Sequence, residues 1–528
     1  MLTLSQLQHG KGSPIVLGLL AAAAVSTALY SIRAWKEKSA SNAPDSSILR
    51  VSFLPSIPLL DNTLEVEANG SRMLDWELER MKERDGKPFA VAIIGKCDLI
   101  FTANPQHFEQ ILKAQSSNFD RGASMHEMYV DFMGESILIV NGDRWKYHRK
   151  VIVNLFSARA IRDVMTPVIQ KNIGVLVDIL AKASENGETL DFHKLVNKFT
   201  LETFAEIGFG RKLGNLASPD DHPFEKAFDE AHHISAMRLM SPTWLWKLKR
   251  WLNVGTEGRL RESMLVINEF LMETITSMME RRALKAQTSS KDILSIIFDT
   301  METSGQTITP ADIRDIVFTG MIAGRDTTAD ALAWLMHMLH CNPRVVTNLR
   351  EEIMTKLPKF AQSESYVPSM EDVQGLVYLE ATIRELLRLF PTAPHIGYHC
   401  IRDIVFPDGT FIPVDTNVMM SLYASARLES VWGADAASFI PERFIDKDSG
   451  EVLQISSLKF ATFSAGPRVC VGRNLAMLEL KLVTACLVSR FRLEEVSGQH
   501  VTYTRGVTIG MKNPLMMKVE KVSAAESR

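Results

Sequence analysis

One cysteine lies in a loop whose residue types and spacing suit a metal ligand. The loop spans 463–472 with the sequence FSAGPRVCVG, and its pattern rests on Phe463, Gly466, Arg468, Cys470 and Gly472. Glycine and proline favour a tight turn, and the apolar segment 475–487 that follows is expected to form a helix. A thiolate at this place lies near a helix N-terminus, where the helix dipole stabilises negative charge.

A single thiolate limits the kind of metal site. The chain has five cysteines and no CxxC pair, which excludes a secreted-type disulfide framework and indicates a reducing compartment. One cysteine without neighbouring Cys or His ligands cannot close a zinc or iron–sulfur site, but it can be the axial ligand of haem iron. A role as small buried hydrophobic residues is the simpler interpretation for Cys97, Cys341, Cys400 and Cys486.

At this loop the sequence resembles the cytochrome P450 haem-thiolate monooxygenases, and the resemblance covers nearly the whole chain. A second motif, Trp145 to Arg149, matches the WxxxR pattern of that family. An indole N–H and a guanidinium one helical turn apart lie on one face and suit a carboxylate. The resemblance implies that both side chains bind a propionate of haem b, that Cys470 ligates its iron, and that the cofactor also contacts Phe463, Gly466, Arg468 and Gly472.

The longest predicted helix lies in the centre of the chain. Thr309 can cap its start, Pro310 suits its first turn, and the pattern continues to about Leu339. Residues 323–328, with the sequence AGRDTT, are poor helix formers because glycine and threonine lower helix propensity. We therefore expect a local distortion there, and a groove in which a ligand lies against the backbone.

Family resemblance assigns roles within this central segment. It implies that Asp326 and Thr327 are the acid and alcohol that supply protons during dioxygen reduction, and that Ala323 and Gly324 lie against the haem. Animal fatty-acid ω-hydroxylases often carry a glutamate that esterifies the haem, and the matching position here is Ala323. The cofactor is therefore expected to be held without a covalent bond.

A further motif, Glu385 to Arg388, matches ExxR. The two side chains can pair at i, i+3, and Arg443 would complete a buried ion network that is structural in the family. Apolar neighbours favour burial of this pair over a solvated surface pair. His395 occupies the place of a propionate-binding Arg or His in relatives, although a hydrogen-bonded loop histidine is the plainer alternative.

The elements that must position these residues are mostly helical. The 528 residues carry 59 Lys+Arg against 62 Asp+Glu, so the chain lacks the basic surplus of a nucleic-acid-binding protein. We predict a mostly α protein with small β-sheets and the cytochrome P450 fold, as one large domain at 49–528. The clearest helical segments are 144–157, 195–207, 260–286 and 373–390, and the strands are 88–94, 98–102 and 403–412, the last with a turn at Asp408-Gly409.

An uncharged apolar run at 15–32 is long enough to cross a bilayer as a helix. Arg33, Lys36 and Lys38 follow it, so the positive-inside rule places the rest of the chain in the cytosol. We predict a single-pass anchor at 1–35 and a linker at 36–48, in the endoplasmic reticulum membrane. A cleaved secretory signal is the alternative.

Electrons must come from another protein, because the chain contains no phosphate-binding glycine-rich loop for a flavin or a nicotinamide. The resemblance implies a microsomal NADPH-dependent flavoprotein reductase, with cytochrome b5 as a further donor. Its predicted docking surface consists of the basic helix and nearby cations, and a plain solvated face is the alternative. The cations are Arg144, Lys146, Arg149, Lys150, Arg473 and Lys481.

Three segments, 323–328, 423–433 and 439–444, look like the plant and fungal fatty-acid ω-hydroxylase branch. By family position, the substrate pocket would be lined by Phe318, Ile322, Ala323, Thr327, Ala393, Ile396 and Ile509. The alternative for each of these residues is packing in the core. The substrate carboxylate would be bound by Arg121 or Arg238. Sterols, terpenoids and xenobiotics stay open as substrates, and so do a lipid hydroperoxide isomerase or dehydratase and a non-catalytic haem protein.

Overall fold

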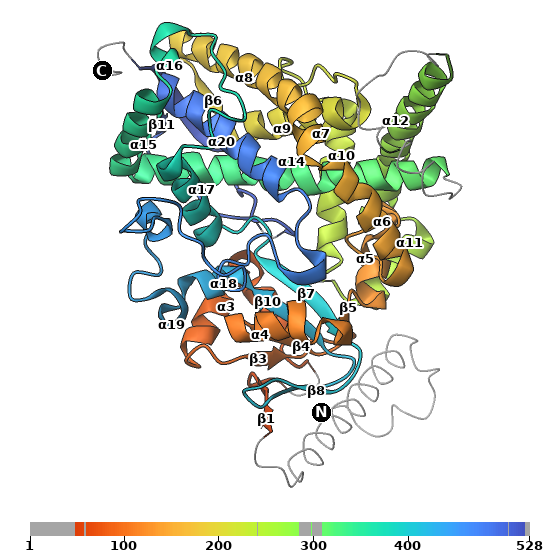
Figure 1. The fold of residues 1–528 in the computed structure, drawn as a ribbon. Helices are drawn as coiled ribbons and strands as arrows, with labels where there is room; N and C mark the ends of the chain where they lie inside the picture. The colour runs from red at the N-terminus through yellow and green to blue at the C-terminus, as the bar shows by residue number, and fades with distance from the viewer. Residues whose placement is uncertain are drawn as a thin grey trace, which may run out of the picture.

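The computed structural model describes residues 48–57, 60–239, 241–284, 297, 309–504 and 506–522. They form one domain with a helix-rich part and a smaller sheet-rich part (Figure 1). The predicted fold class, mostly α with small β-sheets, is confirmed. The predicted anchor at 1–35 and nearly all of the linker at 36–48 lie outside the described residues.

Helices make up most of the described chain. In its first half they are α2 (Thr63–Ala68), α3 (Met73–Lys82), α4 (Pro105–Glu109), α5 (Ala123–Met133), α6 (Gly142–Leu155), α7 (Ala158–Ala160), α8 (Thr166–Asn186), α9 (Phe192–Phe209), α10 (Pro223–Met237), α11 (Thr243–Leu252) and α12 (Thr256–Leu284). In its second half they are α14 (Pro310–Cys341), α15 (Pro343–Lys356), α16 (Lys359–Gln362), α17 (Val377–Leu389), α18 (Leu422–Arg427), α19 (Glu429–Trp432) and α20 (Arg473–Arg490).

Helix α14 crosses the middle of the molecule, as the predicted long helix should (Figure 1). Its start is fixed by a capping box, in which Thr309 and Asp312 each bond the other's backbone N–H. The helix continues through 323–328 without a break, so the expected distortion is at most local. There the Thr327 hydroxyl donates to the Ala323 carbonyl at 2.7 Å, one turn earlier.

The core gathers around α14 because most of its side chains are buried, and most of the buried ones are apolar. It packs against α9, α12, α17 and α20. Trp334 stacks on Phe390 with ring centroids 4.3 Å apart, and its indole N–H donates to the Ile509 carbonyl at 2.6 Å. Such an aromatic pair adds roughly 1 kcal/mol to the area it buries. The central helix is therefore held rigidly, and so are the side chains that it carries.

The largest sheet has the strand order β2-β3-β4-β10-β7-β5. Strand β10 (Asn417–Ser421) is parallel to β4 (Leu99–Thr102) and antiparallel to β7 (His395–Cys400). The other members are β2 (Ser52–Phe53), β3 (Phe89–Val91) and β5 (Phe119–Asp120). A second sheet has the order β1 (Leu49–Arg50), β9 (Thr410–Ile412) and β8 (Ile404–Val405). A third has the order β11 (Phe491–Glu495), β12 (Met516–Lys521) and β6 (Thr189–Asp191).

The strand predictions at 88–94, 98–102 and 403–412 are confirmed, with shorter bounds. They correspond to β3, β4 and the antiparallel pair β8–β9. The predicted turn between the last two is present, and Gly409 adopts a φ of 88°, which glycine tolerates best. Strands β7 and β10, which are neighbours in the largest sheet, were not predicted.

One helical stretch of the described chain is long and apolar enough to cross a membrane by length and composition alone. It is Ala158–Asn186, and 39% of its most apolar window is buried. Its fully buried side chains include Ile169, Ile173, Leu176 and Leu180, which belong to the main core cluster. We therefore assign this stretch to the core of the domain.

Candidate functional site

The loop that carries Cys470 is fixed by close backbone packing. It contains a short 3₁₀ turn, Gly466–Arg468, and the Cys470 N–H donates to the Phe463 carbonyl at 2.9 Å. Gly466 has a φ of 66°, and a Cβ placed there would lie 1.9 Å from the Leu112 carbonyl oxygen. Only glycine fits this position. At Gly472 a Cβ would meet only ordinary contacts, so its presence is not explained by packing.

Cys470 lies just before α20, as predicted. The residue as a whole is exposed, yet desolvation by the surrounding protein raises the pKa of the thiol. Backbone N–H groups of Gly472 and Arg473, and the charges of Arg149 and Arg473, act in the opposite direction and favour the thiolate. In the described part of the chain no cluster of three or more His, Cys, Asp or Glu could hold a metal ion. A lone thiolate beside cations suits one axial ligand of an iron.

The other cysteines only partly match their prediction as buried hydrophobic residues. Cys400 and Cys486 are buried, but Cys97 and Cys341 are exposed. None of the four shares the hydrogen-bonded helix start that surrounds Cys470, and nothing in the structure gives them a role in the site.

Three arginines gather beside the Cys470 loop. Arg149 and Arg468 were predicted to be there, whereas Arg121 had been assigned to the substrate carboxylate. Each guanidinium donates to a backbone carbonyl, Arg121 to Gly397 at 2.7 Å, Arg149 to Val469 at 2.6 Å and Arg468 to Val140 at 2.9 Å. Arg468 also lies over the Trp145 ring, with its guanidinium carbon 4.8 Å from the centroid. The WxxxR pair and the cysteine loop therefore meet, as expected.

This cluster has more positive charge than its surroundings balance. Desolvation and the nearby charge of Arg121 lower the pKa of Arg468 to about 10. Among the described residues no carboxylate lies within ion-pair distance of these guanidinium groups, and the buried Nε of Arg121 has no hydrogen-bond partner. These half-buried cations have no counter-charge among the described residues, so the cluster requires anionic ligands. Two propionates next to a thiolate-bound iron satisfy this requirement, and the residues fit a haem.

His395 does not join this cluster, which corrects its predicted role. Its Nε2 lies 2.7 Å from an oxygen of Glu77, a fully buried acid on α3. The Ser421 hydroxyl donates to the same oxygen at 2.9 Å. A buried carboxylate needs such partners, so the histidine is used to satisfy Glu77. Gly397, two residues later, faces the site through the carbonyl that accepts from Arg121.

The acid and the alcohol of α14 lie in different surroundings. Ala323 is exposed and Thr327 half-buried, although both belong to the middle of the core helix. Asp326 is buried and is bound from two sides, by Arg325 Nη1 at 3.0 Å and by His232 Nδ1 at 2.8 Å. Burial would raise its pKa, but these partners outweigh burial and hold the pKa at about 2. Asp326 is thus a carboxylate at neutral pH.

Gly324 serves helix packing. A Cβ on it would lie 2.1 Å from the ring of Phe204 on α9, so the absence of a side chain lets α9 and α14 approach. The direction that a side chain would take at Gly324 therefore faces α9, and contact between Gly324 and the cofactor stays a prediction. Ala323 is the neighbour whose side chain is exposed.

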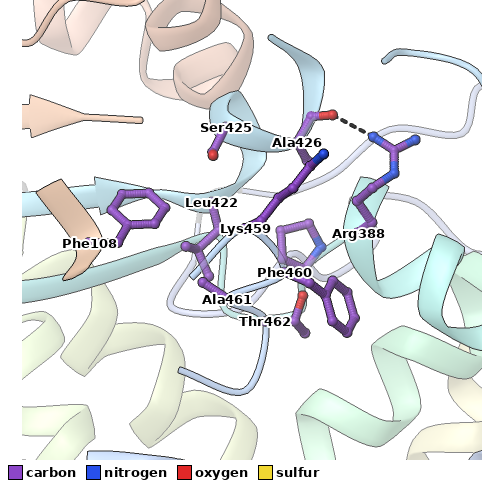
Figure 2. A pocket seen from close by; sticks show the side chains of 10 residues that line it. Phe108, Arg388, Leu422, Ser425, Ala426, Lys459, Phe460, Ala461 and Thr462 are labelled. Carbon is purple, nitrogen blue, oxygen red and sulfur yellow. Dashed lines mark hydrogen bonds between the residues drawn. The ribbon is translucent and has the colours of Figure 1, made fainter. Parts of the chain in front are cut away.

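The ExxR motif forms the predicted ion network. Arg388 donates to both oxygens of Glu385, at 2.7 and 2.8 Å, and both side chains are fully buried. Arg443 lies 3.5 Å from the same carboxylate. Figure 2 shows how Arg388 also reaches the Ala426 carbonyl beside a small cavity of about 10 Å³. The network ties α17 to α18 and to the loop after α19.

The predicted pocket residues divide into two groups. Phe318 is fully buried between the rings of Phe132 and Phe228, and Ile322 and Ile509 expose only a few per cent of their surface. Phe318 is therefore a core residue, which corrects its assignment. Ala393 and Ile396 are partly exposed and, with Ala323, can line a ligand.

Arg238 cannot bind a substrate carboxylate. Its side chain is 2% exposed and is already paired with the buried Glu257 and, at 2.9 Å, with Asp131. The carboxylate role is therefore corrected for Arg238, and Arg121 belongs to the cationic cluster described above. Lys481 is likewise buried and bound to Glu380 at 2.6 Å, so it is not part of an exposed docking face.

Comparison with known proteins identifies the family. The cytochrome P450 family model matches residues 52–517. Cytochrome P450 CYP94D109 of Paris polyphylla is 31% identical over 80% of this chain and 85% of that protein, and cytochrome P450 94A2 of Vicia sativa is 30% identical over 93% and 95%. The crystal structure of the cytochrome P450DA heme domain shares the fold, with a TM-score of 0.76 at 20% identity over 91% of this chain and 99% of that chain. The chain belongs to the cytochrome P450 family of haem-thiolate monooxygenases.

Proposed function

We propose that this monooxygenase hydroxylates the terminal carbon of medium- and long-chain fatty acids. The support is the likeness of 323–328, 423–433 and 439–444 to plant and fungal fatty-acid ω-hydroxylases. Oxidation at a terminal methyl attacks a stronger C–H bond than oxidation at its methylene neighbours. The pocket must therefore select the methyl by holding the chain end-on, and the small apolar residues Ala323 and Ala393 suit such a pocket.

The single observation that carries the oxygen chemistry is the meeting of Cys470 with the Arg121, Arg149 and Arg468 cluster. Haem bound there supplies dioxygen activation, which a thiolate ligand promotes. The arginines and Trp145 would hold the propionates. Asp326 and Thr327 would supply protons for dioxygen reduction, through water.

The reaction consumes electrons, and we assign their delivery to a separate NADPH-dependent flavoprotein reductase, with cytochrome b5 as a further donor. The apolar run at 15–32 supports a single-pass anchor in the endoplasmic reticulum membrane, with the catalytic domain in the cytosol. Such an anchor keeps the enzyme at the membrane in which its lipid substrates dissolve.

The test is turnover of a mixture of medium- and long-chain fatty acids and one sterol with NADPH and a microsomal reductase, followed by mass spectrometry. Terminal alcohols are the expected products, and Cys470→Ser should lose both the thiolate spectrum and the products. Wild-type protein with an intact thiolate spectrum that oxidises only the sterol would overturn the substrate assignment. Conversion of an added lipid hydroperoxide without NADPH, with no oxidation of the fatty acids, would instead indicate an isomerase or dehydratase.

A further inference from the structure

A polar cavity of about 510 Å³ lies against α14 and reaches Asp326. Helices α9 and α10, Thr504 and residues within 506–514 form its other walls. Its rim includes the exposed residues Lys226, Asp229 and Lys512, and its inner wall includes His232, Asp326 and Asp330. The cavity therefore connects the surface with the buried acid by a path of ionisable and polar groups, which suits ordered water.

His232 of α10 joins the cavity to the acid. Its Nδ1 lies 2.8 Å from Asp326 Oδ2, and its ring stacks on Phe132 with centroids 5.7 Å apart and an interplanar angle of 15°. The imidazole also lines the cavity. One ring thus contacts the carboxylate and the polar space, and packing fixes its orientation.

The charged groups around the pair come from three helices. On α14, Arg325 is buried and paired with Asp326 at 3.0 Å, with Asp229 and with Glu225 at 3.7 Å. On α9, His193 is paired with Asp330 at 3.2 Å. Burial disfavours a charged His232, but the hydrogen bond and the charge of Asp326 outweigh burial and raise the pKa of the imidazole. The carboxylate itself stays ionised, with a pKa of about 2.

The contacts and pKa directions give Asp326 and His232 different roles. Because its pKa is so low, Asp326 carries almost no proton at neutral pH and cannot store the proton that the reaction takes from it. The imidazole of His232, which contacts Asp326, can store that proton. We propose that His232 holds the proton that Asp326 passes toward Thr327, and that cavity water recharges the imidazole. The inference rests on the proton demand of the monooxygenase reaction and does not depend on which substrate is oxidised.

The step balances without a change of redox state. The His232 Nδ1–H bond breaks as a proton moves to Asp326 Oδ2, and a neutral imidazole and a carboxylic acid result. The carboxylic acid releases a proton to water beside Thr327 and becomes a carboxylate again. The imidazole keeps its Nε2–H throughout and is recharged at Nδ1, by a proton that cavity water places on Asp326, which also lines the cavity. His232 acts through Asp326, so it is a positioning residue of the proton path.

The first test is a titration that does not use turnover. Histidine labelled with ¹³C at Cε1 is incorporated into the full-length, haem-loaded protein, and His232 is identified by the signal that His232→Asn removes. We expect its pKa to lie above the ordinary value of about 6.5 and to fall in Asp326→Asn. A His232 pKa at or below the ordinary value, or one that Asp326→Asn leaves unchanged, would overturn the proposal.

The second test separates a proton role from a structural one. Asparagine keeps an N–H donor for Asp326 but does not titrate near neutral pH. His232→Asn should keep the thiolate spectrum and substrate binding, yet release at least about tenfold more peroxide per product and lose the pH dependence of coupling. The control is His233→Asn, since His233 lines the same cavity without contacting Asp326. Wild-type coupling and pH profile in His232→Asn would show a structural role only and refute the relay.

Discussion

Glu479 is a buried acid without a partner in the part of the chain that the structure describes. It lies on α20 with a fully buried side chain, and neither carboxylate oxygen has a hydrogen-bond partner. Desolvation raises its pKa from 4.5 to about 8. The group is therefore neutral at pH values below this, which avoids the cost of a buried unpaired charge.

The consequence at this residue is a pH-dependent loss of stability. The stabilising contribution of protonated Glu479 is complete below pH 4.5, and it is lost as the pH rises toward the folded-state pKa of about 8. Glu479→Gln removes that titration. We expect the variant to gain on the order of 3 kcal/mol over wild type between about pH 5 and about pH 8, measured as thermal midpoints at a fixed scan rate. The exposed Glu494→Gln is the control, and parallel pH curves for Glu479→Gln and wild type would contradict the assignment.

Side chains with local partners could be predicted from the sequence, whereas those with distant partners could not. Cys470 and the ExxR pair lie in short motifs in which spacing alone places the groups together. His395 was misassigned because its partner, Glu77, lies on α3 and comes close to it only in the folded chain. For the same reason no sequence pattern links His232 to Asp326, since they lie on separate helices.

At the scale of elements, the contact between α9 and α14 depends on one missing side chain. A Cβ at Gly324 would lie 2.1 Å from the ring of Phe204, which is held in the core. Overpacking of this kind costs about 1–3 kcal/mol. At Gly320 on the same helix a Cβ would meet nothing within 4 Å, and alanine there should gain about 1 kcal/mol in helix propensity.

We therefore expect opposite effects from the same substitution at two positions of α14. Gly324→Ala should lower the thermal midpoint of the haem-loaded protein, and Gly320→Ala should leave it unchanged or raise it. Adding Phe204→Leu to Gly324→Ala should restore part of the loss, because the smaller side chain gives room for the new methyl group. Equal midpoints for the two alanine variants would mean that the helix contact tolerates the methyl group.

A similar comparison uses two glycines with positive φ, Gly466 in the cysteine loop and Gly498 outside it. Gly466→Ala adds strain and also a Cβ 1.9 Å from the Leu112 carbonyl oxygen, whereas Gly498→Ala adds strain alone, with nothing within 4 Å. Strain costs about 1 kcal/mol, so Gly498→Ala should shift the midpoint slightly and keep the thiolate spectrum. Gly466→Ala should lose that spectrum. A normal spectrum in Gly466→Ala would show that the loop and Leu112 can move apart.

Elements were predictable where the signal was local. The capping box and proline define the start of α14 at the predicted residue, and Asp408-Gly409 defines the β8–β9 hairpin. Strand β10 was missed because it is short and its main partner, β4, lies more than 300 residues earlier in the chain. Pairing between distant segments leaves little trace in either segment.

At the scale of the whole molecule, a net charge of −3 gives no general attraction for an acidic partner. A docking surface must therefore be local. Helix α6 offers one, because Arg149 points inward to the Val469 carbonyl beside Cys470, whereas Lys146 and Lys150 are exposed. The outer face of α6 is thus the surface of a helix that contacts the cysteine loop directly. We therefore predict that the electron donor docks on this outer face of α6.

Charge reversal tests this surface. In the variant Lys146→Glu, Lys150→Glu, the reductase should reduce the haem at least about tenfold more slowly at low salt, and the difference should shrink at high salt because ions screen the attraction. Lys447→Glu with Lys518→Glu makes the same charge change at exposed positions elsewhere in the fold. Stopped-flow reduction under carbon monoxide measures the rate. Equal slowing in both variants would attribute the effect to net charge and remove α6 as the docking face.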